Sequence, residues 1–164
     1  MSKRKALDDD SGFEFVDIHN LAGAYEAEES YSDSDDQENY FVTGLKTWAE
    51  DPDCTEEERE SREGAIEIII NTKKDKTDIL SLEGFELSSL PEQIAELDFL
   101  KELQLSENNL SSIPDWISNL VSLKVLDLSD NEIQTIASEI GNLTSLESLH
   151  LGGNRIETIP PRAW

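Results

Sequence analysis

The residues of this sequence that could most readily take part in chemistry are acidic. Several of them lie at polar positions of a motif that repeats every 23 residues. Grouped carboxylates on a rigid surface attract cationic groups, so their expected chemistry is electrostatic recognition rather than bond making. Amide, ammonium and imidazole side chains at neighbouring positions add hydrogen-bonding capacity. The predicted partner-binding residues are Glu102, Gln104, Glu107, Lys124, Asp127, Asp130 and His150.

Catalytic chemistry has little support in the sequence. His150 has no nucleophile in register beside it, and Cys54 is the single cysteine, which excludes an internal disulfide and a zinc site of the usual spacing. The glycine pair at Gly152 lacks the lysine and the spacing of a phosphate-binding loop. We therefore predict that the chain is not an enzyme and uses no cofactor and no metal.

A repeated strand pattern positions the candidate residues. The motif L-x-x-L-x-L-x-x-N-x-L occurs as LKELQLSENNL at 100–110, LKVLDLSDNEI at 123–133 and LESLHLGGNRI at 146–156, with a weaker copy, TDILSLEGFEL, at 77–87. It resembles the leucine-rich repeat. Because side chains alternate along a strand, the leucines are expected on one face and the polar residues on the other. The sequence thus predicts an α/β solenoid of stacked parallel strands over 77–164, with units starting at 77, 100, 123 and 146.

Two further features of each unit follow from residue type. The asparagine of the motif is expected to satisfy backbone groups in the turn after the strand, starting at the second unit because Phe85 replaces it in the first. Pro91 and Pro114 fix φ and favour the start of a short helical segment on the convex side, where Ala137 stands in the third unit.

Residues 40–76 are predicted to form a helical cap that shields the first repeat. Aromatic and aliphatic residues fall at helical spacing after residue 40, until Pro52 breaks the helix. Thr55 begins a second helix, with Glu58 at the capping-box position. Asn71–Thr77 is expected to be the loop that leads into the first repeat.

A second resemblance covers residues 40–91. The matching elements are Tyr40-Phe41, Trp48, RESREGAIEIII at 59–70 and LSSLP at 87–91. They resemble the helical cap of secreted bacterial ubiquitin ligases of the IpaH and SspH type, which are delivered into host cells by type III secretion. Residues 40–91 contain one tryptophan, where those proteins often have two, and the 23-residue repeat is longer than the repeats usual in that family. Because the chain contains no counterpart of the large C-terminal catalytic domain, the ligase activity is not carried over.

The net charge of −24 limits the classes of partner. It disfavours binding to nucleic acid and to anionic membrane surfaces, and it favours a basic protein partner. Residues 1–39 are rich in acids and poor in aliphatics, so they are predicted to be an acidic disordered tail. No apolar run is long enough for membrane insertion, and the basic start of the chain is not followed by the apolar region of a Sec signal peptide.

The main functional prediction is a non-catalytic protein–protein interaction module in the cytoplasm, which binds a protein partner on the concave face of the repeats. The alternative is a secreted bacterial effector or adaptor fragment, which enters a host cell without a Sec signal peptide and serves as substrate receptor for a separate ubiquitin ligase. The oligomeric state stays open, because the open edge of the last strand could pair with another chain.

Overall fold

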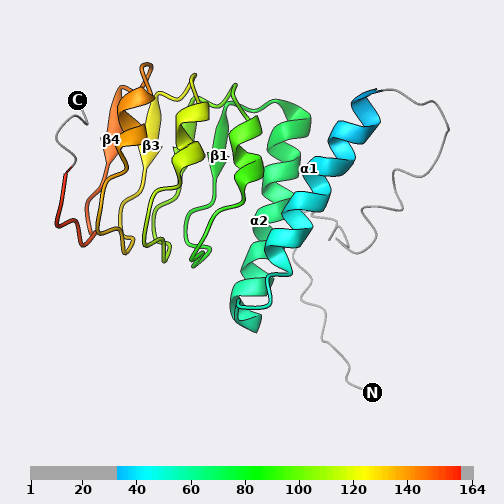
Figure 1. Ribbon diagram of the computed structural model, residues 1–164, viewed down its shortest axis with the longest axis horizontal. Helices are drawn as coiled ribbons and strands as arrows, with labels where there is room; N and C mark the ends of the chain where they lie inside the picture. The colour runs from blue at the N-terminus through cyan, green and yellow to red at the C-terminus, as the bar shows by residue number, and fades with distance from the viewer. Residues whose placement is uncertain (1–32, 160–164) are drawn as a thin grey trace, which may run out of the picture. The chain divides into compact units, whose positions relative to one another are not determined.

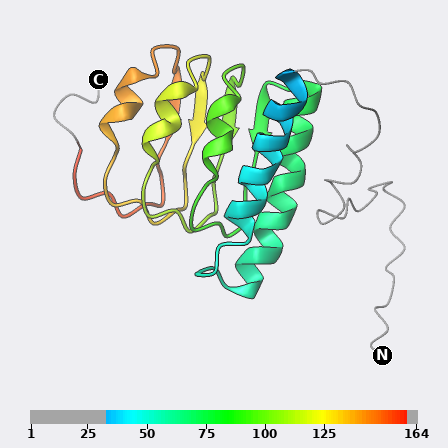
Figure 2. The same cartoon turned by 45° about the vertical axis from the view of Figure 1, so that its right-hand side comes forward.

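The computed structural model describes residues 33–159, which form a helical hairpin followed by four repeat units (Figure 1). Helix α1 spans Asp33–Ala49 and helix α2 spans Glu56–Asp75. The two helices pack side by side at one end of the stack of repeats, and α2 lies against the first strand (Figures 1 and 2). Residues 1–32 of the predicted tail lie outside the described part of the chain.

The repeat units pair through one parallel sheet in the order β1-β2-β3-β4. Leu80, Leu103 and Leu126 align in register and have no exposed surface, whereas Leu149 in the last unit is only half-buried. This arrangement confirms the predicted α/β solenoid with a helical cap. The strands are β1 (Ile79–Ser81), β2 (Glu102–Gln104), β3 (Val125–Asp127) and β4 (Ser148–His150).

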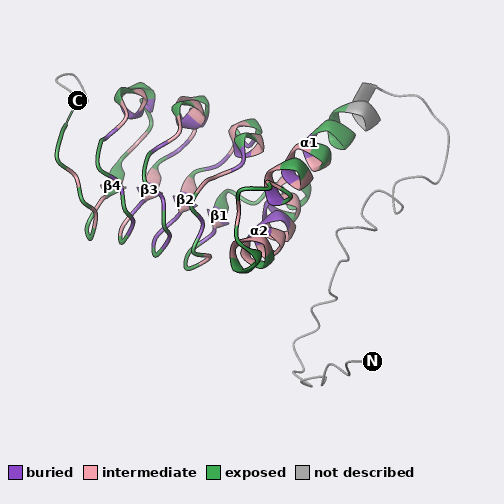
Figure 3. Ribbon diagram, turned by 60° about the horizontal axis from the view of Figure 1, so that its bottom comes forward, coloured by how far each residue is buried: buried purple, intermediate pink, exposed green. Residues whose placement is uncertain are grey.

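In each of the first three repeat units a short 3-10 helix lies on the far side from the strand, and buried residues lie between the two (Figure 3). Pro91 and Pro114 precede the first two of these helices with extended backbones, as predicted. Ala137 adopts φ −65° and ψ 137°, close to the −71° and 138° of Pro91, so packing holds this conformation without proline. The helices are η2 (Glu92–Glu96), η3 (Asp115–Asn119) and η4 (Ser138–Asn142).

The predicted asparagine ladder is present and begins at the second unit. The side-chain amide of Asn108 donates to the backbone oxygen of Leu82 at 2.7 Å, and its Oδ1 accepts from the Leu87 amide at 2.9 Å. Asn131 and Asn154 repeat this pattern one unit further along. Each asparagine therefore satisfies buried backbone groups of the preceding unit and ties neighbouring coils together.

Phe85, which replaces the asparagine in the first unit, packs against the cap instead. A Cβ atom added to Gly64 of α2 would lie 3.1 Å from Cε1 of Phe85, a tight contact that a larger residue would strain. Gly64 thus allows the aromatic ring to approach the helix closely. In the first repeat, an aromatic contact with the cap thus takes the place of the asparagine hydrogen bonds.

Both cap helices extend beyond their predicted bounds. Helix α1 begins at Asp33 rather than near residue 40, so residues 33–39 of the predicted tail are helical. Helix α2 continues to Asp75, which corrects the prediction that Asn71–Thr77 forms a loop. Thr72 is buried in the last turns of α2, so packing sustains the helix through a stretch whose polar residues suggested a loop.

The predicted start of α2 is confirmed, because the Thr55 hydroxyl accepts a hydrogen bond from the Glu58 amide at 3.1 Å. The Glu58 carboxylate, however, bonds to Arg62 and Ser88. The capping partner therefore also joins the cap to the first repeat. Within residues 33–159, no helix has both the length and the apolar character needed to cross a membrane.

Candidate protein-binding surface

The sheet brings four of the predicted residues together on the solvent side of the strands, which we call the strand face. Its first column consists of Ile79, Glu102, Val125 and Ser148, and its second consists of Ser81, Gln104, Asp127 and His150. The leucines between these columns point inward and are buried, apart from the half-buried leucine of the last unit. A mostly polar surface, with Ile79 and Val125 as its apolar members, therefore runs across β1–β4.

Local hydrogen bonds hold the two strand-face carboxylates in place. Gln104 Nε2 donates to Glu102 Oε1 at 2.7 Å, so neighbouring side chains of β2 brace each other. The amide of Ser129 donates to Asp127 Oδ1 at 2.9 Å, which fixes the second carboxylate at the end of β3. Each of these bonds uses one carboxylate oxygen. The second oxygen is held in a fixed orientation and can accept a hydrogen bond from a ligand.

Glu107 and Asp130 lie in the turns after the strands rather than in the two columns. Both are exposed and adopt left-handed conformations, with φ of 55° and 52°. Gly84 and Gly153 occupy the equivalent positions of the first and last units with φ of 72° and 70°. The repeat thus requires this conformation, which glycine adopts freely and other residues adopt at a cost. The two acids extend the acidic surface along one edge of the strand face.

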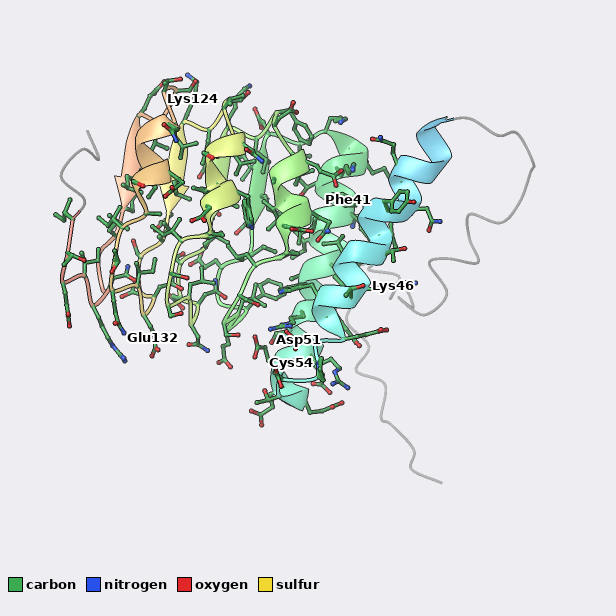
Figure 4. The ribbon with its side chains drawn as sticks, in the orientation of Figure 1. Phe41, Lys46, Asp51, Cys54, Lys124 and Glu132 are labelled. Carbon is green, nitrogen blue, oxygen red and sulfur yellow. The ribbon has the colours of Figure 1, made fainter. Side chains whose placement is uncertain are left out.

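Lys124 is not available on the strand face, although the sequence placed it among the binding residues. Its Nζ lies 2.8 Å from Oε1 of Glu147 in the next unit, and this hydrogen bond raises the pKa of Lys124. Figure 4 shows Lys124 at the opposite edge of the repeats from Glu132. One unit earlier, Lys101 pairs with Asp78 at 2.9 Å and lowers the pKa of that carboxyl group.

The strand face is consequently acidic. None of the residues of β1–β4 is a lysine or an arginine, and the two bordering lysines are already paired with acids. His150 is exposed at the end of the second column. The acids at Glu102 and Asp127 therefore have no lysine or arginine beside them within the strands, and His150 is the register partner of Asp127.

Among residues 33–159, His150 and Cys54 lie on separate elements and do not form a joint site. Cys54 is half-buried in the loop between α1 and α2, where its thiol lies 3.7 Å from the backbone oxygen of Ala49 (Figure 4). His150 lies on β4, on a different element. Among the described residues, no group of three or more metal-binding side chains is close enough to hold a metal ion.

Sequence analysis missed Arg62, the one buried base of the described cap. It is 3% exposed and donates to Glu58 Oε1 at 2.9 Å, to Ser89 Oγ at 3.1 Å and to the backbone oxygen of Trp48. Its guanidinium also lies 5.0 Å from the centroid of the Trp48 ring. The four-residue spacing of Glu58 and Arg62 was the available signal. Arg62 joins α1, α2 and the first repeat, so its role is structural.

Comparison with known proteins agrees with this geometry. Residues 79–158 match the family model described as "Leucine-rich repeat region". No curated protein matches the sequence. Together with the solved structures below, this match identifies the solenoid as a leucine-rich-repeat fold. Proteins with such repeats generally mediate protein–protein interaction and are typically not catalytic.

Two solved structures share the fold. A leucine-rich repeat protein of Leptospira interrogans is 33% identical, with a TM-score of 0.51, over 60% of this chain and 23% of its own length. YopM, a leucine-rich effector protein from Yersinia pestis, is 25% identical, with a TM-score of 0.56, over 76% of this chain and 32% of its own. The chain spans about a third or less of either protein. The similarity of the cap to the IpaH and SspH ligases stays a prediction.

Proposed function

We propose that the chain binds a basic protein partner on its strand face and performs no catalysis. The observation that carries this proposal is the pair of carboxylates at Glu102 and Asp127 on neighbouring strands, which hydrogen bonds hold in place. Fixed carboxylates lose little side-chain freedom when they bind a cation, so more of the interaction energy is retained.

Two apolar side chains on the strand face also support this proposal. Ile79 is 48% exposed at the cap end of the first column, and Val125 is half-exposed two strands away. The acids Glu102 and Asp127 lie beside them in the sheet. A partner with basic side chains around an apolar residue would satisfy both features. The acids would mainly set the association rate and the specificity, which makes the association sensitive to salt.

The test is affinity capture from cell lysate with the wild-type chain and a neutralised variant, Glu102→Gln, Asp127→Asn and Asp130→Asn. These amides keep an acceptor oxygen at each site, and asparagine tolerates the left-handed conformation of Asp130. The matched control changes exposed acids on the other side of the coils by the same total charge: Glu92→Gln, Asp98→Asn and Asp115→Asn.

The expected result is a basic protein that is captured at about 50 mM salt and lost at about 500 mM salt, since screening weakens exposed charge pairs. It should also be lost with the strand-face variant and kept with the control. Capture that is equal for the two variants would refute the strand face as the binding surface.

A second candidate function is an effector or adaptor that enters a host cell and presents a substrate to a separate ubiquitin ligase. The similarity to the Yersinia effector supports it, because a match over 76% of the chain extends past the repeats into the cap. In a reconstituted assay, ubiquitin transfer to the captured partner should require both this chain and a ligase on another chain. Transfer that is unaffected by omitting this chain would rule the adaptor role out.

A further inference from the structure

A groove at the cap differs in charge from the rest of the molecule. It lies between the N-terminal half of α1 and the C-terminal end of α2, and its volume is about 560 Å³. Gln37 and Glu38 also contribute to its lining. Its apolar and basic residues are Phe41, Val42, Ile70, Lys73, Lys74 and Lys76. An apolar surface surrounded by lysines is unusual for a chain with a net charge of −24.

Aromatic rings hold two of these lysines in position. The ammonium of Lys73 lies 3.5 Å from the centroid of the Phe41 ring and 2.7 Å from a carboxylate oxygen of Glu96. The ammonium of Lys76 lies 4.5 Å from the centroid of the Phe99 ring. Cation–π contacts of this kind restrict a flexible side chain before any ligand arrives. The charges of the groove are therefore partly preorganised, which lowers the entropy lost on binding.

The groove also gathers basic side chains that form no ion pair with the acids that the structure describes. Within the described residues, Lys46, Lys74 and Lys76 are the lysines and arginines for which the structure shows no ion pair. Lys74 and Lys76 line the groove, and Lys46 lies one turn beyond Val42 on α1. The other described lysines and arginines each lie within ion-pair distance of a carboxylate.

The stability of α2 accounts for Lys74 but not for Lys76. A lysine in the last turn, such as Lys74, favours the negative end of the helix dipole. Lys76, however, follows the helix in a left-handed conformation with φ 53°, where glycine would be free of strain. The Phe99 ring instead holds the Lys76 ammonium beside the groove.

We propose that this groove binds an acidic peptide segment of a partner protein, anchored by one aromatic or branched aliphatic side chain. The apolar side chain would pack on Val42 and Ile70, and flanking carboxylates would pair with Lys74 and Lys76. The groove is lined by the cap helices and the strand face by β1–β4, so this proposal does not rest on the proposed function. Figure 4 shows Phe41 on α1, away from Lys124 on the repeats.

The test begins with a displayed library of random 12-residue peptides, selected on the folded full-length chain and counter-selected on the double variant Lys74→Glu and Lys76→Glu. Enriched peptides should be acidic and contain an aromatic or branched aliphatic residue. Enrichment of basic or uncharged sequences, or of peptides that the double variant retains, would overturn the assignment.

The affinity of an enriched peptide is then measured by fluorescence anisotropy. The double variant should weaken binding by about tenfold at low salt, whereas Lys101→Glu with Arg155→Glu, an equal charge change outside the groove, should leave it within about twofold. Lys76→Gly separates binding from folding, because it removes the ammonium and relieves the backbone strain. It should weaken binding while the unfolding midpoint stays the same or rises.

Two outcomes would contradict the proposal. If the neutralised strand-face variant loses the peptide and the groove variant keeps it, the acidic peptide binds elsewhere and the groove proposal fails. If sedimentation shows a dimer that the groove variant dissociates, the occupant is a second copy of the chain rather than a partner. Loss of the peptide only in the groove variant supports the groove whether or not the strand face binds a basic protein.

Discussion

Replacing Arg62 with methionine should destabilise the junction between cap and repeats by about 3 kcal/mol, because it removes a buried charge and leaves its partner unpaired. The guanidinium is 3% exposed and makes hydrogen bonds to Glu58, Ser89 and the backbone of Trp48. Methionine keeps most of the aliphatic packing, so the lost free energy comes mainly from the polar contacts.

The magnitude follows from those contacts. A hydrogen bond to a charged group contributes about 1.5–3 kcal/mol and a neutral one about 0.5–1.5 kcal/mol, and the values are not fully additive. The carboxylate of Glu58 is 15% exposed, so it cannot be fully rehydrated once Arg62 is gone. The Ser88 amide and hydroxyl still bond to that carboxylate, which limits the loss.

The assay is urea unfolding followed by circular dichroism, with Arg59→Met as the control. Arg59 is 38% exposed and 3.7 Å from Glu56, so its replacement should change the free energy of unfolding by less than about 1 kcal/mol. In a double-mutant cycle, Arg62→Met and Glu58→Gln should show coupling of about 1–3 kcal/mol. Equal losses for the two arginine variants, or an additive cycle, would refute the assigned role of Arg62.

Four further predictions use the same unfolding assay. Leu126→Ala should lower the free energy of unfolding by about 2–5 kcal/mol, and Leu149→Ala by clearly less, because only the first residue is fully buried; equal losses would contradict the burial argument. Asn131→Ala should lower it by about 2–4 kcal/mol, since buried backbone groups of two units lose their partner; a loss below about 1 kcal/mol would show that water replaces the amide. Ala137→Pro should raise it by about 0.4–1 kcal/mol, because the backbone already has the φ of proline; a loss would reveal a required amide hydrogen. Burial tends to raise the pKa of Glu58, but the hydrogen bonds from Ser88 and Arg62 lower it overall. The ionised carboxylate therefore contributes to folding stability at neutral pH, and this contribution is lost as the pH falls below about 4.5. Glu58→Gln should lose less stability than the wild type on acidification, and parallel pH profiles of the two proteins would contradict this.

Part of the candidate site could be predicted because its residue positions depend only on strand alternation and on the repeat length. The positions of Glu102, Gln104, Asp127 and His150 in two columns follow from the alternation of a strand and the fixed repeat length. The left-handed turns at Glu107 and Asp130 were not predicted. Their glycine equivalents in the first and last units were a visible but unused signal.

The sequence by itself determined the solenoid, the inward leucines and the asparagine ladder, because each coil repeats one local pattern and stacking forces equivalent residues into register. Only the tertiary structure decided the ion pair that occupies Lys124, the burial of Arg62, the length of α2 and the basic groove of the cap. These features depend on contacts between residues that no periodicity relates. A charged side chain is buried or free according to what packs against it, and that is set by the whole fold.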